Sequence, residues 1–110
     1  MNSRILRTLP REKAFYFFTS IGNYTGESAT SLKEFTDKIN EVNVKSLEFH
    51  FYRGDFEKWT AEVLEDKNLA EYIRRLRGQV LKGDELRVQL YMTVSKRYSN
   101  LTSQLNISQI

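Results

Sequence analysis

Apolar residues recur three and four positions apart along most of the chain, and this spacing is typical of helices that bury one face. Five runs show it, at residues 32–42, 44–51, 56–63, 69–80 and 91–105. The last run is the most regular, with its apolar seam at Tyr91, Val94, Tyr98, Leu101 and Leu105. The pattern predicts a compact all-α domain of five or six short helices with a longer C-terminal helix.

The first aromatic segment fits two structures. Ala14, Phe17, Phe18 and Ile21 follow the helical spacing, and Pro10 suits a first helical turn. The alternative is an extended start through this segment, because aromatic residues also suit strands. The stretch "GNYTG" at 22–26 ends either element, since its two glycines adopt backbone conformations that other residues avoid.

Polar residues at the starts of several runs predict where helices begin. Ser31 and Glu34 form a capping-box pair, whose hydroxyl and carboxylate satisfy free amides at a helix start. Asn43 and Asp66 are suitable caps for two further helices. Gly54 is expected to end one helix, and Asp55 to cap the next.

The stretch "SLEFHFYRGDFEKW" at 46–59 holds the only His and the only Trp of the chain. One interpretation is a catalytic site with His50 as general base and Asp55 as its partner. The other is a tight helix–helix turn held by buried aromatic side chains. We favour the turn, because no second base or nucleophile accompanies His50, and we assign no catalytic residue and no metal ligand. The predicted structural motif comprises His50, Arg53, Gly54, Asp55, Phe56 and Trp59.

Three segments together resemble a family of small archaeal proteins whose function is uncharacterised. They are "FYFFTSIGNYTG" at 15–26, "SLKEF" at 31–35 and the stretch at 46–59, and the likeness extends to about Arg97. The resemblance implies a small, mainly helical, cytosolic domain and supplies no activity. Relatives often have Gly-Asp where this chain has Glu65-Asp66, so the turn at this point is expected to differ in shape.

Composition and charge narrow the class of protein. With 110 residues, 40% hydrophobic and 28% charged, the chain suits one globular domain over residues 1–110. It has no cysteine for disulfides or thiolate metal sites, and no signal peptide or membrane span is apparent, so we expect a cytoplasmic protein without membrane contact. The scattered glycines form no phosphate-binding loop, and we expect no cofactor.

The charges are unevenly distributed along the chain. Residues 1–13 carry a net +3, residues 14–66 a net −5 and residues 67–110 a net +5. We expect residues 1–11 to form a flexible basic arm and residues 106–110, which lack charge, to fray. Basic ends of this kind either bind a polyanion or complement the acidic middle of the fold.

Two surfaces are therefore candidates for binding a partner. The first is a basic patch formed by Arg74, Arg75, Arg77, Lys82 and Arg87. The second is apolar: eleven of the fourteen aromatic residues lie between Phe15 and Trp59, more than a small core easily hides. The leading hypothesis is a non-enzymatic protein-interaction or regulatory domain that can self-associate, for example through the seam from Tyr91 to Leu105. The second hypothesis is a nucleic-acid-binding protein that uses the basic patch, and the third is an enzyme built around His50 and Asp55.

Overall fold

The structure is a computed structural model that describes the backbone of residues 2–108 and the side chains of residues 4–105. It contains two β-strands, five α-helices and three 3-10 helices. The strands are β1 (Phe15–Ser20) and β2 (Asn23–Ala29). The α-helices are α1 (Leu32–Glu41), α2 (Val44–Arg53), α3 (Asp55–Glu62), α4 (Lys67–Leu76) and α5 (Gly83–Ser108). The 3-10 helices are η1 (Asn2–Leu6), η2 (Arg11–Lys13) and η3 (Arg77–Gln79).

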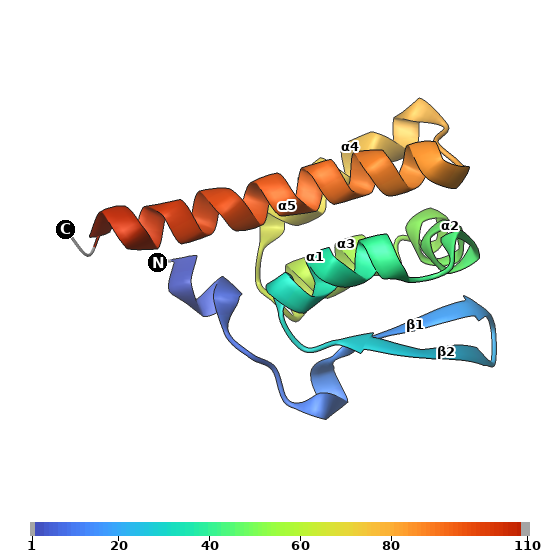
Figure 1. The fold of residues 1–110 in the computed structure, drawn as a ribbon, viewed down its shortest axis with the longest axis horizontal. Coiled ribbons are helices and arrows are strands. Elements are labelled where there is room, and N and C mark those ends of the chain that lie inside the picture. The colour runs from blue at the N-terminus through green and yellow to red at the C-terminus, as the bar shows by residue number, and fades with distance from the viewer. Residues whose placement is uncertain (1, 109–110) are drawn as a thin grey trace.

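The elements are stacked in three levels (Figure 1). A hairpin of β1 and β2 lies on one side, α1, α2 and α3 form the middle, and the long α5 lies with α4 on the far side. The inner face of the hairpin packs on α1 and α2, and α5 packs on α1, α2 and α4. The outer face of the hairpin is therefore turned away from all the α-helices.

The hairpin corrects the prediction of an all-α fold, since the fold is mainly helical but includes an antiparallel pair of strands. The helix predicted from the spacing of Ala14, Phe17, Phe18 and Ile21 is wrong, and the alternative of an extended segment is confirmed, since β1 occupies Phe15–Ser20. The actual period is two: Phe15 and Phe17 are buried, whereas Tyr16 between them is exposed. Gly22, with a φ of 82°, forms the turn between the strands.

The core is built around an aromatic cluster between the hairpin and the middle helices. Phe15 supplies its centre, with ring centroids 5.8 Å from Phe35, 5.1 Å from Phe56 and 5.6 Å from Trp59. All four rings are buried. Aromatic pairs at these distances, of which the Phe35 and Trp59 pairs are edge-to-face, add about 0.5–1.5 kcal/mol each to the stability gained from burial. The strand β1 is thereby fixed to α1 and α3.

Three predicted helix caps are confirmed. Ser31 Oγ accepts a hydrogen bond from Glu34 N (3.1 Å), Asn43 Oδ1 from Lys45 N (2.8 Å) and Asp66 Oδ1 from Leu69 N (3.1 Å). Each bond satisfies an amide that has no partner within its helix. The predicted cap at Asp55 is wrong, because Gly54 occupies the cap position and no side chain caps α3.

The seam of α5 and the N-terminal segment both pack on the domain. Val94 and Leu101 are fully buried, and Tyr91 and Tyr98 lie against the core. The segment predicted as a flexible basic arm at residues 1–11 contributes Ile5 to the same core, and η1 lies against α5. This difference arises because its apolar residues Ile5 and Leu9 are buried in the core. Of the residues predicted to fray at 106–110, the backbone of 106–108 continues α5, and the other two residues lie outside the described part of the chain.

Candidate functional site

The predicted motif at 46–59 forms a hydrogen-bonded cluster at the junction of β1, α2 and α3. The His50 ring is buried, with 4% of its surface exposed. Its Nε2 lies 2.8 Å from Phe18 N of β1, and its Nδ1 lies 2.8 Å from Asp55 Oδ2. Arg53 Nε donates to the same Asp55 oxygen at 3.0 Å, and its guanidinium lies over the Phe49 ring. Asp55 therefore pairs with both His50 and Arg53.

These contacts define the protonation state of His50. The Phe18 amide can only donate, so Nε2 must be unprotonated and Nδ1 carries the proton that bonds to Asp55. Burial lowers the pKa of His50 from its ordinary 6.5, although the Asp55 carboxylate opposes this shift. A hollow of about 340 Å³ reaches His50 and Asp55. Both ring nitrogens are nevertheless engaged, so the imidazole clamps β1 to the turn between α2 and α3.

The remaining residues of this motif hold the turn. Gly54 ends α2 in the left-handed conformation, with a φ of 78°, where its amide bonds to the last carbonyls of the helix. Phe56 is fully buried in the aromatic cluster. Trp59 is also buried, and its Nε1 donates to the Lys13 carbonyl at 2.9 Å. These residues therefore hold the turn, whereas Asp55 pairs with His50 and Arg53 and does not cap α3.

The predicted basic patch is only partly assembled. Arg74 and Arg75 share the Glu71 carboxylate, with Arg74 Nη2 at 2.6 Å and Arg75 Nε at 3.2 Å. The hydrogen bond from Arg74, aided by Arg75, lowers the pKa of Glu71 to about 2. Lys82 is exposed in the connection between η3 and α5. Arg77 and Arg87 lie elsewhere and bond to protein groups.

These two arginines, together with Arg7, donate hydrogen bonds to backbone carbonyls at the C-terminal ends of helices. Arg87 Nη1 donates to the Ile39 carbonyl at 2.8 Å near the end of α1, and Arg77 Nη1 to the Phe51 carbonyl at 3.0 Å near the end of α2. Arg7 Nη2 donates to the Val63 carbonyl at 2.7 Å just after α3. Carbonyls at helix ends lack partners within the helix and carry partial negative charge. Three basic residues thus stabilise the fold.

The hairpin makes a surface that was not predicted from the sequence. We call this surface the hairpin face and define it by Tyr16, Phe18, Ile21 and Tyr24. Their side chains lie on the outer side of the strands or at the turn, and 83% of Ile21, 48% of Tyr24 and 38% of Tyr16 is exposed. The Tyr24 ring lies 5.8 Å from Tyr16 and 5.4 Å from Phe18. The signal in the sequence was the aromatic run "FYFF", because in a strand its alternate side chains lie on opposite faces and one aromatic set is then left on the outer face.

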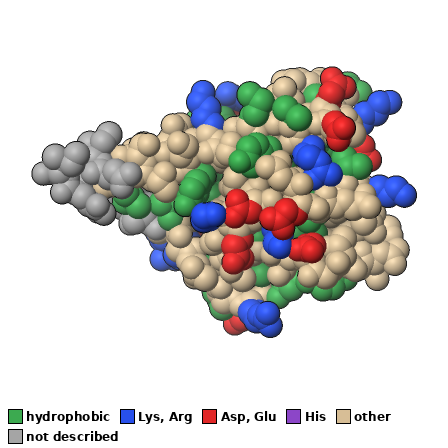
Figure 2. All heavy atoms as spheres, in the orientation of Figure 1, with side chains coloured by type: hydrophobic (Ala, Val, Ile, Leu, Met, Phe, Trp, Pro, Cys, Tyr) green, Lys and Arg blue, Asp and Glu red, His purple; other side chains and the backbone are tan. Residues whose placement is uncertain are grey.

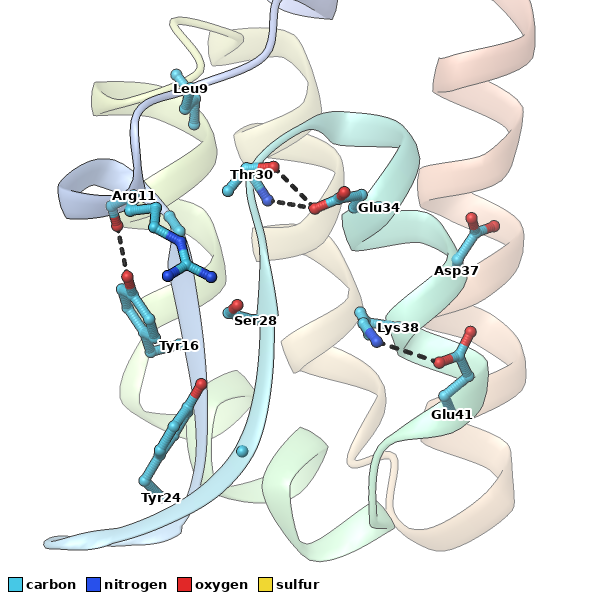
Figure 3. A pocket seen from close by; sticks show the side chains of 12 residues that line it. Leu9, Arg11, Tyr16, Tyr24, Ser28, Thr30, Glu34, Asp37, Lys38 and Glu41 are labelled. Atoms are coloured by element: carbon cyan, nitrogen blue, oxygen red, sulfur yellow. Dashed lines mark hydrogen bonds and ion pairs between the residues drawn. The ribbon is translucent and has the colours of Figure 1, made fainter.

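A groove of about 770 Å³ adjoins the hairpin face along the side of β2. We call it the α1–β2 groove. Arg11, Tyr16, Tyr24 and Ser28 lie on its strand side, and polar residues of α1 lie opposite them (Figure 3). The residues contributed by α1 are Glu34, Asp37, Lys38 and Glu41. Acidic side chains gather near the middle of the visible face in Figure 2, where α1 lies in Figure 1.

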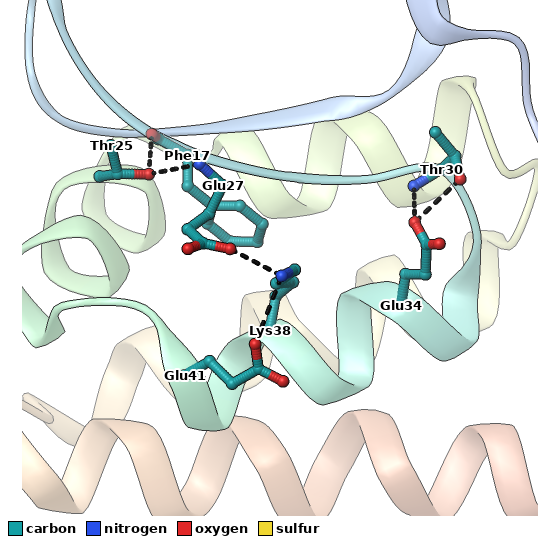
Figure 4. Close-up of polar contacts among 7 residues, drawn as sticks. All are labelled: Phe17, Thr25, Glu27, Thr30, Glu34, Lys38 and Glu41. Carbon is teal, nitrogen blue, oxygen red and sulfur yellow. Dashed lines mark hydrogen bonds and ion pairs between the residues drawn. The ribbon is translucent and has the colours of Figure 1, made fainter.

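Polar contacts hold β2 and α1 in place around this groove (Figure 4). Lys38 Nζ lies 2.6 Å from Glu27 Oε1 of β2 and 3.3 Å from Glu41 Oε1 of its own helix. Thr25 Oγ1 donates to the Phe17 carbonyl at 2.8 Å and accepts from Glu27 N at 3.1 Å, which bridges the irregular register between the strands. The groove is therefore formed by fixed elements.

Backbone hydrogen bonds show which groups of β2 face the groove side. Thr30 N donates to Glu34 Oε1 at 2.8 Å, and the Thr30 carbonyl accepts from Leu9 N at 2.7 Å, so both groups point away from β1. In a two-stranded sheet each strand pairs on one side only, so alternate residues of β2 direct their backbone groups away from β1. The edge of β2 thus presents backbone groups beside the groove.

Within the described part of the chain, no three His, Cys, Asp or Glu side chains come together as a metal-binding set. None of the described helices is both long enough and apolar enough to cross a membrane.

The fold and its contacts define a small, mainly helical domain with a hairpin that exposes aromatic side chains. The model of DUF5752, a family of unknown function, matches residues 10–109, and the chain belongs to this family. Searches of the curated proteins and of the solved structures found no match.

Proposed function

We propose that this domain is a non-enzymatic protein-interaction module that binds a segment of a partner protein on the hairpin face and in the α1–β2 groove. The observation that carries the proposal is the exposure of Tyr16 and Tyr24 on the hairpin strands and of Ile21 at the turn between them. Aromatic residues are enriched in protein interfaces and often provide most of the binding energy. As part of this proposal, we place the domain in the cytoplasm, as expected from the sequence.

The groove supplies the polar part of the proposed interface. Its charged residues Glu34, Asp37, Lys38 and Glu41 form a rim beside the aromatic hairpin face. An apolar centre with a polar rim is the usual composition of a protein interface. The edge of β2 adds backbone groups that an extended segment of a partner can pair with.

The geometry of His50 supports a binding role over an enzymatic one. A general base needs a free nitrogen within reach of the proton that it removes. In this cluster Nδ1 bonds to Asp55 and Nε2 to the Phe18 amide, so using either nitrogen for catalysis requires breaking a contact of the fold.

The partner can also be a second copy of the chain. The seam of α5, through which self-association was expected, has Val94 and Leu101 buried in the domain. A homo-oligomer would therefore use the hairpin face. Sedimentation equilibrium at high micromolar concentration tests this case: Ile21→Asp should shift a dimer to monomer, and a wild-type monomer would exclude a second copy as the partner.

Peptides selected from a display library against the immobilised domain provide the general test. Their affinities are measured by calorimetry for wild type, for Ile21→Asp and for Tyr24→Asp. We expect each change to cost about 2 kcal/mol or more, which is about thirtyfold in affinity, because it places a charge in the aromatic centre.

The matched control is Val88→Asp, which places the same charge at another exposed apolar residue, on α5. This variant should retain the wild-type affinity. Equal losses in Val88→Asp and Ile21→Asp, or selection of the same peptides by the Ile21→Asp/Tyr24→Asp double variant, would contradict the proposal.

A further inference from the structure

A second hollow, of about 510 Å³, lies between α4 and α5. It is remote in sequence from the hairpin and combines one aromatic ring, three basic groups, a hydroxyl and an amide. These are Tyr72, Arg75, Thr93, Lys96, Arg97 and Asn100. A volume of this size is in the range of small-molecule sites.

Arg97 is held rigidly at this hollow by a buried carboxylate. Its Nε lies 2.8 Å from Asp66 Oδ2 and its Nη2 lies 3.1 Å from Asp66 Oδ1, while Asp66 also caps α4 through Leu69 N. Only 1% of the Asp66 side chain and 11% of the Arg97 side chain is exposed. Among the described residues, Nη1 of Arg97 has no hydrogen-bond partner. A guanidinium held by a carboxylate through Nε and Nη2 is preorganised and keeps Nη1 available for an anion.

The other two basic groups are also available. Arg75 bonds to Glu71 through Nε alone, and its side chain is 66% exposed. No ion pair to Lys96 occurs in the part of the chain that the structure describes. Arg75 therefore presents positive charge from α4, and Lys96 presents it from α5, on two sides of one hollow. Arg97 of α5 also lines the hollow, and its bond to Asp66 joins α5 to the start of α4.

We propose that this hollow binds a nucleotide, either free or as a unit of a single-stranded nucleic acid. Arg75, Lys96 and Arg97 bind the phosphate, since charge-assisted hydrogen bonds from basic groups are the usual means of holding it. The Tyr72 ring, which is 42% exposed, offers a surface on which the base stacks. The Asn100 amide, with both donor and acceptor atoms, pairs with the edge of the base.

This site differs from the basic patch that the sequence predicts. It retains Arg75 but excludes Arg77 and Arg87, whose guanidinium groups bond to carbonyls of α2 and α1. It adds Lys96, which lies twenty-one residues after Arg75 in the sequence and reaches the hollow only through the packing of α5 on α4.

Amide chemical shifts of the labelled domain test the proposal during titration with four probes. The probes are adenosine monophosphate, adenosine, inorganic phosphate and an oligoadenylate hexamer. We expect the monophosphate to shift amides of α4 and α5 around the hollow and to bind more tightly than either adenosine or phosphate. If the hexamer binds more tightly than the monophosphate and its binding depends strongly on salt, the ligand is single-stranded nucleic acid. If the hexamer binds equally or more weakly, the ligand is a free nucleotide.

Lys96→Gln removes one exposed charge and should weaken binding of the monophosphate by about tenfold or more, as expected for a charged hydrogen bond. Lys45→Gln removes the same charge at an exposed position outside the hollow and should leave the affinity within about twofold. The proposal is overturned if no probe shifts the amides around the hollow, if phosphate binds as tightly as the monophosphate, or if the two variants weaken binding equally.

Discussion

Acidification from about pH 7.5 to about pH 5.5 should destabilise the folded protein through His50, the only histidine of the chain. In the folded state the unprotonated Nε2 accepts a hydrogen bond from the Phe18 amide, and a proton on that nitrogen would break this bond. Burial lowers the pKa of the folded His50, whereas the unfolded chain should have a pKa close to 6.5. As the pH falls, the unfolded state therefore binds the proton first.

The sign and size of the effect follow from this difference in pKa. Wherever the unfolded state binds more protons, the free energy of unfolding rises with pH, by at most about 1.4 kcal/mol per pH unit for one group. The stability should fall from about pH 6.5 down to the pKa of folded His50. Among acidic groups, hydrogen bonds lower the pKa of Glu34, Glu65 and Glu71 below 4.5, so these carboxylates titrate at more acidic pH.

Urea unfolding at a series of pH values measures this dependence in wild type and in His50→Gln. The variant lacks the titrating group, so its stability should change much less between the two pH values. His50→Ala should remain folded but be less stable by about 2–4 kcal/mol, because the Phe18 amide loses its acceptor and a small cavity forms. A wild-type stability that is constant or increases on acidification, or an equal slope in His50→Gln, would refute this reasoning.

Three further predictions concern single positions. Trp59→Ala should lower the free energy of unfolding by about 3–5 kcal/mol in thermal or urea unfolding, because the ring is buried and donates a hydrogen bond to the Lys13 carbonyl. Unchanged stability would contradict the structural role of the motif at 46–59 and make it a candidate functional surface. Glu65→Gly should be more stable than Glu65→Ala by about 1 kcal/mol, since residue 65 has a φ of 66° and both changes remove the same ion pairs; the opposite order in the same assay would show that this conformation carries no strain. Arg97→Ala should cost about 3–5 kcal/mol by leaving Asp66 buried without its partner, and Asp66→Asn should recover part of that loss in the double variant; strictly additive losses would refute the coupling.

Local signals in the sequence predicted the helical part of the fold. The caps at Ser31, Asn43 and Asp66 depend on residues two or three positions away, so a one-dimensional pattern contains them. The hairpin was missed because the apolar residues of "AFYFFTSI" fit both a helical period and alternation. Burial of Phe15 against α1 and α3, which no local pattern contains, selects the strand.

The turn after α3 shows how a local rule can be overruled. Glu65 occupies the left-handed conformation, with a φ of 66°, although this region favours glycine. Bonds from Arg4 and Arg7 to the Glu65 carboxylate help to hold it.

The functional surfaces depended mostly on contacts between distant residues. Arg7, Arg77 and Arg87 bond to carbonyls that are 56, 26 and 48 residues away, so charge counting alone assigned two of them to a binding patch. The hairpin face and the α1–β2 groove likewise require the pairing of β1 with β2 and the position of α1. The structural role of His50 was predictable, because its partner Asp55 lies five residues away across the turn.

The most direct test of the proposed binding role is an amide chemical-shift map of the labelled domain with the tightest peptide selected against it. Binding at the hairpin face and the α1–β2 groove should shift amides of β1, β2 and α1, and Ile21→Asp should abolish these shifts while Val88→Asp preserves them. Shifts confined to α4 and α5, or unaffected by Ile21→Asp, would contradict the account.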